Sequence, residues 1–123
     1  MTRRRLEVGA AGEAAARAYL EEKGYAIEEL NFRCPLGEID IIAREGSMLV
    51  FCEVRTNTGG DLTAALESMT PSKLKRLRRL ALYYQQKVYG SDIPCRFDFL
   101  AVLLDPENRQ ALEIKHIQNV VSG

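Results

Sequence analysis

Three charged side chains in the middle of the chain have the types and the spacing to do chemistry. Asp40 is followed after twelve residues by Glu53, and Arg55 stands two positions further on. Two carboxylates held close together repel each other unless a proton or a cation lies between them. A divalent ion that prefers oxygen ligands, Mg²⁺ or Mn²⁺, suits such a pair. The pattern therefore predicts a metal site, although exposed strand carboxylates are the simpler interpretation for an arbitrary hairpin.

A β-hairpin would bring these side chains together. Residues 37–55 contain two β-rich runs on either side of Glu45-Gly46, which is a turn signal between strands. If those two residues form the loop, Asp40 lies diagonal to Glu53, with roughly 7–8 Å between their backbones. One face of this hairpin is wholly apolar, whereas the other is apolar near the turn and charged at its open end. Glu38 lies at the charged end and could orient a ligand of the ion without binding the ion itself.

The same residues resemble a known nuclease signature. Asp40 followed by Glu53-Val54-Arg55 resembles the Asp…Glu-x-Lys pattern of the restriction-endonuclease-like fold, except that Arg55 stands where the pattern has Lys. The longer string is similar to the YraN-like bacterial proteins, a small family grouped with archaeal Holliday-junction resolvases. The matching motifs extend from about Gly9 to Leu104 and include Gly12-Glu13, Asn31-Phe32-Arg33, Gly37-Glu38-Ile39-Asp40, Val50-Phe51-Cys52-Glu53-Val54, Thr70-Pro71 and Arg96-Phe97-Asp98.

The resemblance implies a metal-dependent endonuclease that acts on DNA. It implies that Glu13, on the first helix, completes the metal site of Asp40 and Glu53, and it implies branched DNA and a homodimer. Taken alone, Glu13 has a simpler interpretation, because an acid in a first helical turn suits the helix dipole and Arg17 lies one turn away. In the nuclease interpretation Asp40 and Glu53 hold Mg²⁺ or Mn²⁺, and Arg55 contacts the scissile phosphate.

The arginine at position 55 leaves a second interpretation open. Arg keeps its proton at any accessible pH, so Arg55 cannot act as a base, but its planar fork can hold a phosphate. We therefore expect tight DNA binding with slow cleavage. The alternative is a nucleic-acid-binding module on a nuclease fold that does not cleave. A third interpretation is a structural domain whose carboxylates are only solvated surface.

A helix with only basic charges is predicted after Thr70. Thr70 suits the N-cap and Pro71 the first helical position. The stretch from Thr70 to Gly90 holds six Lys or Arg residues and no acid. Basic side chains on one helix can hold a DNA backbone, although a solvated face explains them equally well. The predicted nucleic-acid-binding residues on this helix are Lys73, Lys75, Arg76, Arg78 and Arg79.

The order of the predicted elements is α-β-β-β-α-β-β, which indicates an α/β fold with a mixed sheet flanked by helices. This agrees with the restriction-endonuclease-like resemblance. Residues 1–8 are expected to form a basic arm, in which a solvated terminus is a simpler interpretation than phosphate contacts, and residues 9–123 a single domain. The predicted segments are a helix over 9–23, strands over 25–33 and 37–55, a loop over 56–61, the basic helix from 70, and strands over 95–104 and 111–118.

Composition restricts the remaining possibilities. The chain has 123 residues, 28% of them charged, and a formal net charge of zero, so a nucleic acid must be held by local patches. Its three Cys are too scattered for a metal motif, and the single His116 excludes a zinc site made of several histidines. The chain has no apolar run long enough to span a membrane and does not begin like a signal peptide. We expect a cytoplasmic protein with no membrane partner.

Overall fold

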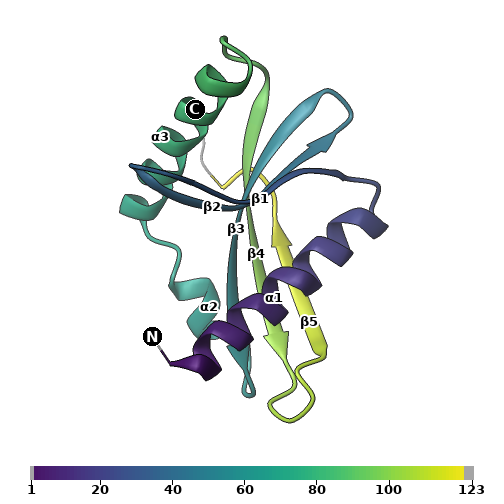
Figure 1. Ribbon diagram of the computed structural model, residues 1–123. Helices are drawn as coiled ribbons and strands as arrows, with labels where there is room; N and C mark the ends of the chain where they lie inside the picture. Colours follow the sequence, from purple (N-terminus) through teal and green to yellow (C-terminus); the bar gives the residue numbers. More distant parts are fainter. Residues whose placement is uncertain (1, 121–123) are drawn as a thin grey trace.

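Five strands form one mixed sheet in the computed structural model of the chain, which describes residues 2–120 (Figure 1). The element order is the predicted one with one addition, the short helix α2. No helix within these residues is both long and apolar enough to cross a membrane. The elements are α1 (Arg3–Glu22), β1 (Ala26–Cys34), β2 (Gly37–Glu45), β3 (Met48–Thr58), α2 (Thr63–Glu67), α3 (Pro71–Val88), β4 (Cys95–Leu104) and β5 (Ala111–Ile117).

The strands lie in the order β1-β2-β3-β4-β5, so β4 is interior and β5 is an edge strand. β3 and β4 are parallel, and the other three neighbouring pairs are antiparallel. Parallel strands cannot be joined by a tight turn, because the chain must return to the starting end of the sheet. Here α2 and α3 supply that return.

Helices cover both faces of the sheet (Figure 1). α1 packs on one face, where Leu20 joins Cys52 and Leu100 in one apolar cluster. α3 packs on the opposite face, where Tyr84 meets Phe51 edge to face. All five of these side chains are buried. The two layers hold the strands from both sides and fix the positions of the residues at the strand edges.

The hairpin between β2 and β3 has a different register from the predicted one. Glu45 pairs with Met48, so the two-residue loop is Gly46-Ser47 rather than Glu45-Gly46. Side chains alternate along a strand with a period of two, and the register differs by two residues, so each strand keeps its predicted faces. The last pair of the ladder is Ile41 with Cys52, so Asp40 and Glu53 are the next residues on their strands rather than a diagonal pair.

Two predicted boundaries were wrong. α1 begins at Arg3 rather than at residue 9, so residues 3–8 of the predicted basic arm are the first turns of a helix, and Met1 lies outside the described residues. The hydroxyl of Thr2 caps that helix by accepting the N–H of Arg5 at 3.3 Å. Gly9, which suggested a boundary, lies inside the helix. β3 continues to Thr58, so it includes part of the predicted loop.

α1 approaches the sheet most closely at Gly12. A methyl group built on Gly12 would lie 1.9 Å from Oγ1 of Thr56 in β3. The same construction on Gly9, one helical turn earlier, meets nothing within 4 Å. Gly12 is therefore required by the contact between α1 and β3, whereas Gly9 is not.

We predict that Gly12→Ala lowers the free energy of unfolding by about 1–3 kcal/mol, because overpacking at this contact outweighs the better helix propensity of Ala. Gly9→Ala is the matched control and should be neutral or stabilising by up to about 1 kcal/mol. Chemical denaturation of both variants tests this. Equal effects of the two substitutions would show that the contact at Thr56 does not constrain α1.

Candidate functional site

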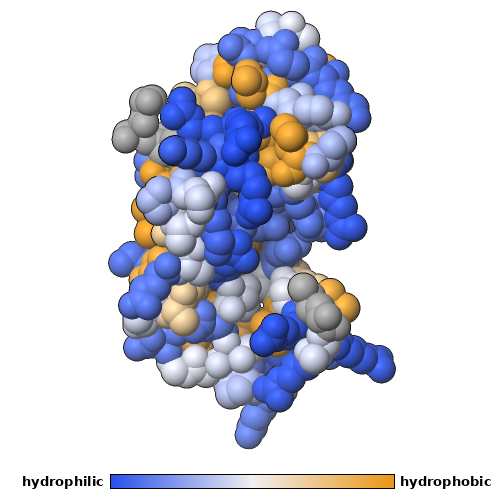
Figure 2. Space-filling view, turned by 90° about the vertical axis from the view of Figure 1, so that its left-hand side faces the viewer, coloured by the Kyte–Doolittle hydropathy of each residue, from blue (hydrophilic) through white to orange (hydrophobic). Residues whose placement is uncertain are grey.

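β3 has a free edge in its second half. The pairing of β2 with β3 ends at Ile41 and Cys52, whereas β4 accompanies β3 to Thr58. A cleft of about 830 Å³ lies between this free edge, the first half of α1 and the β1–β2 hairpin. It is seen as the hollow at the right-hand edge of the space-filling view (Figure 2). The side chains that line it include Arg4, Arg5, Glu13, Asn31, Arg33, Glu38, Asp40, Glu53, Arg55, Thr56 and Thr58.

All the predicted residues of the metal and phosphate site line this one cleft. They come from three separate parts of the chain: Glu13 from α1, Glu38 and Asp40 from β2, and Glu53 and Arg55 from β3. The basic residues predicted on α3 do not line it. They contribute instead to the hydrophilic surface over α3, where apolar side chains are interspersed (Figure 2).

Asp40 lies at the point where the β2–β3 ladder ends. Its carboxyl group accepts a hydrogen bond from the backbone N–H of Val54 at 2.8 Å. A side chain thus provides the partner for one backbone N–H of the free edge of β3. Burial, followed by repulsion from Glu53, raises the pKa of Asp40 to about 8, against an ordinary value of 3.8. At neutral pH Asp40 therefore retains a proton that a nearby cation would displace.

Glu53 and Arg55 leave the same strand two positions apart and interact directly. Nη2 of Arg55 lies 3.2 Å from Oε1 of Glu53. Nε of Arg55 is buried and has no hydrogen-bond partner among the described residues. A buried donor without an acceptor is costly, so this guanidinium has a place for an additional oxygen atom.

Asn31 connects two of the acids and was not predicted as a site residue. It has a left-handed backbone (φ 50°), which Asn tolerates better than most residues. Its amide donates to Glu13 at 2.7 Å and to Glu38 at 3.0 Å. The predicted pair of Glu13 with Arg17 is not formed, and Arg17 lies instead 3.6 Å from Glu21. An Asn within a β-rich run was the signal that sequence reasoning passed over.

The donor set suits a hard divalent cation. Asp40 and Glu53 offer carboxylate oxygens, which Mg²⁺ and Mn²⁺ prefer, and burial together with repulsion from Glu53 raises the pKa of Asp40. Within residues 2–120, no three His, Cys, Asp or Glu side chains already form a group that could hold a metal ion. Glu13 is held by Asn31, so Asp40 and Glu53 form the core of the candidate metal site.

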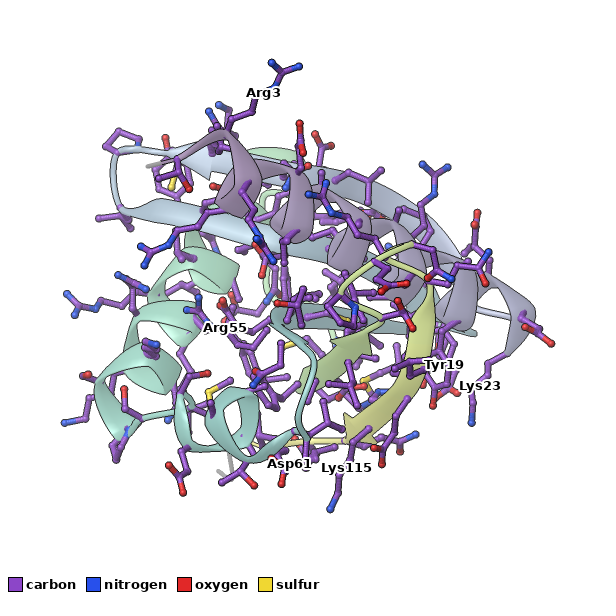
Figure 3. The ribbon with its side chains drawn as sticks, turned by 90° about the horizontal axis from the view of Figure 1, so that it is seen from below. Arg3, Tyr19, Lys23, Arg55, Asp61 and Lys115 are labelled. Carbon is purple, nitrogen blue, oxygen red and sulfur yellow. The ribbon has the colours of Figure 1, made fainter. Side chains whose placement is uncertain are left out.

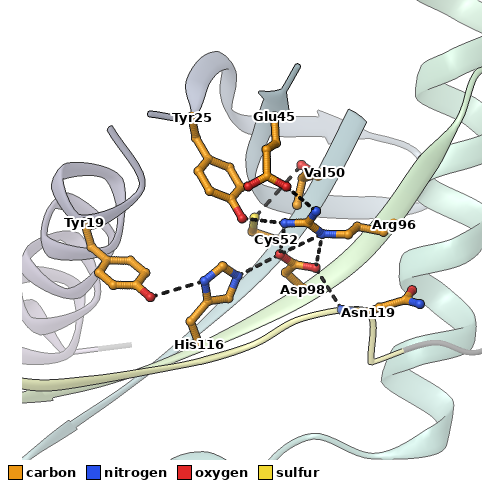
Figure 4. A network of polar contacts seen from close by, with 9 residues as sticks. All are labelled: Tyr19, Tyr25, Glu45, Val50, Cys52, Arg96, Asp98, His116 and Asn119. Carbon is orange, nitrogen blue, oxygen red and sulfur yellow. Dashed lines mark hydrogen bonds and ion pairs between the residues drawn. The ribbon is translucent and has the colours of Figure 1, made fainter. Parts of the chain in front are cut away.

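A buried polar network lies apart from the cleft, on the α1 face of the sheet (Figure 4). Asp98 pairs with Arg96 at 3.1 Å and accepts a hydrogen bond from His116, whose Nε2 is 2.7 Å from Oδ2 of Asp98. The side chain of His116 is buried against Tyr19. Burial opposes ionisation, yet the hydrogen bonds from His116 and Arg96 hold the pKa of Asp98 below its usual value. All its members have partners, so we assign it a structural role.

We predict that Asp40→Asn stabilises the metal-free protein. Between the ordinary Asp pKa of 3.8 and about 8, the folded chain holds a proton on Asp40 that the unfolded chain releases. The stability of the wild type therefore falls as the pH rises through this range, and Asn removes that dependence while keeping an oxygen for Val54. The melting temperature of Asp40→Asn in EDTA should exceed that of the wild type by several degrees at about pH 8. The difference should disappear near about pH 4, and a difference independent of pH would contradict the burial of this carboxyl.

Comparison with known proteins places the chain in a family. The profile of the uncharacterised protein family UPF0102 matches residues 12–102. A UPF0102 protein of Moorella thermoacetica is 50% identical over 111 residues, which cover 90% of this chain and 91% of the relative. A UPF0102 protein of Pelotomaculum thermopropionicum is 44% identical over 112 residues, covering 91% and 92% of the two chains. The resemblance to YraN-like proteins is thus confirmed, and the chain belongs to the UPF0102 family.

Proposed function

We propose that this protein is a metal-dependent endonuclease that cleaves a phosphodiester of DNA in the cleft along the free edge of β3. The observation that carries the proposal is the pair of Asp40 and Glu53, where burial and repulsion raise the pKa of Asp40 to about 8. Perturbed carboxyls inside a cleft are typical of catalytic and metal sites. The arginines in the same cleft provide the charge that a phosphate needs.

Asp40 and Glu53 would hold the ion, with Glu13 as a third ligand if it leaves Asn31. A divalent ion at this position supplies positive charge to the phosphodiester and makes water acidic enough to attack at neutral pH. Asp40 gives up its proton as the ion binds, so binding should release a proton. Val54 keeps the carboxylate of Asp40 in place through its backbone N–H.

Arg55 acts on the substrate in this proposal. Its Nε lacks an acceptor, and a phosphate oxygen would satisfy it while the rest of the guanidinium stays near Glu53. Glu38 remains a supporting residue, because it interacts with Arg33 at 3.6 Å and with Asn31 rather than with the carboxylate pair. Branched DNA, a homodimer and the α3 contacts stay predictions.

The direct test combines metal binding with cleavage. The wild type should bind Mn²⁺ at one site in calorimetry and should cut labelled linear, flapped or four-way DNA when Mg²⁺ or Mn²⁺ is present. Asp40→Asn and Glu53→Gln should lose both properties while they remain folded, because each removes a ligand charge. Metal binding that is unchanged in both variants would exclude this site. Cleavage that persists in both would identify a contaminating nuclease.

A second candidate function is a DNA-binding module on the same fold that does not cleave. The ion pair between Arg55 and Glu53 favours it, because a metal must compete with the guanidinium for that carboxylate. The compact ammonium of Lys would reach less far and would leave Glu53 freer to bind the ion.

We therefore predict that Arg55→Lys raises the cleavage rate of a bound DNA without tightening its binding, whereas Arg55→Ala weakens both. Single-turnover cleavage and fluorescence anisotropy measure the two effects separately. If the wild type cleaves DNA rapidly and Arg55→Lys lowers the cleavage rate, the arginine itself is suited to the reaction. The non-cleaving alternative would then lose its support.

A further inference from the structure

The first turn of α1 carries positive side chains, whereas negative ones are favourable at the N-terminal end of a helix. It begins with Arg3, Arg4 and Arg5 and contains no acid. The N-terminal end of a helix has a partial positive charge, because its first N–H groups lack partners within the helix. Cations at this end destabilise the helix. Residues that break a local rule without a structural gain are expected where function requires them.

The neighbouring arginines differ in their surroundings. Arg3 is an exposed side chain whose Nε lies 3.1 Å from a carboxylate oxygen of Glu7, and it does not line the cleft. Arg4 and Arg5 line the cleft and form no ion pair with any residue of the range 2–120. In the view from below, Arg3 points away from the molecule and Arg55 lies in the space between α1 and α3 (Figure 3).

The cleft contains both acidic and basic side chains that lack an ion-pair partner among the described residues. Two of its arginines are already paired with carboxylates of the same cleft. Asp40 and Glu13 have no cation beside them in the described part of the chain, and Arg4 and Arg5 have no anion. The unmatched acids suit a divalent cation, and the unmatched arginines suit an anion that enters from the α1 side.

We propose that Arg4 and Arg5 bind backbone phosphates of the DNA strand whose scissile phosphodiester lies over Asp40 and Glu53. This inference rests on the proposed function and assigns the main phosphate contacts at the site to α1 rather than α3. The basic residues of α3 lie outside the cleft, and the amine of Lys73 is occupied by the carbonyl of Ser68 at 2.8 Å. The N-terminal turns of α1 thus form one wall of the substrate site.

The test uses the full chain and a fluorescein-labelled linear duplex in EDTA, so that neither metal nor cleavage contributes. Binding is measured by anisotropy over a series of KCl concentrations. Arg4→Ala and Arg5→Ala should each weaken binding several-fold and reduce the slope of log affinity against log salt by about 0.9. The double variant should reduce the slope by about 1.8.

Arg3→Ala is the matched control, because it removes the same charge from the same helical turn but outside the cleft. It should leave the salt slope nearly unchanged. The melting temperatures of Arg4→Ala and Arg5→Ala should equal or exceed that of the wild type, since each removes a cation from the positive end of a helix. Weakened binding in these variants then cannot be attributed to unfolding.

Three results would overturn the inference. The first is a variant with both Arg4→Ala and Arg5→Ala whose slope of log affinity against log salt equals that of the wild type. The second is an Arg3→Ala effect as large as that of Arg4→Ala. The third is a slope that falls only when Lys75 and Arg78 of α3 are replaced by Ala. If the wild type binds and cleaves DNA while the α1 variants are unaffected, only this inference fails, whereas a wild type that binds no DNA refutes the proposed function as well.

Discussion

The site depends on one interruption in the sheet. β2 stops pairing with β3 after Ile41 and Cys52, while β4 follows β3 to Thr58. A free strand edge exposes unpaired backbone groups, and proteins normally cover it. Here the carboxylate of Asp40 binds the N–H of Val54 at the start of that edge. The interaction that ends the ladder therefore also holds the carboxyl group of Asp40 against Glu53, and the cleft opens beside it.

The cleft contains two charge arrangements that do not favour the folded state by themselves. Asp40 is buried beside another acid, which raises its pKa. Arg4 and Arg5 occupy the positive end of α1 without an acid in that turn. In the buried network of Asp98 with Arg96 and His116, by contrast, each charge has a partner. This contrast between unmatched and matched charges separates the cleft from the structural core.

Sequence reasoning succeeded where a local pattern determines the structure. The alternation of side chains identified β2 and β3. The turn lies one residue later than predicted, which shifts the partner of each residue by two and leaves the faces correct. Thr70 and Pro71 marked the start of α3, which begins as predicted. The predicted start of α1 was wrong because the basic residues before Gly9 resemble a solvated terminus. Asn31 was passed over because its role depends on acids from two other elements. Only the family resemblance brought Glu13 into the site.

The two halves of α1 differ in how extensively they pack against the rest of the protein. Its second half is anchored by buried Leu20 and by the bond from Tyr19 to His116, and Gly12 rests directly on Thr56. The turns before Gly9 have exposed side chains apart from the half-buried Val8, and Glu7 ties them to the β4–β5 loop through Arg109 at 2.7 Å. The helix is therefore held most firmly from Gly12 onward, and its first turns are the part that unfolds locally at the lowest free-energy cost. Fraying of these turns would widen the mouth of the cleft without moving Asp40 and Glu53, because those two carboxyl groups are attached to the sheet.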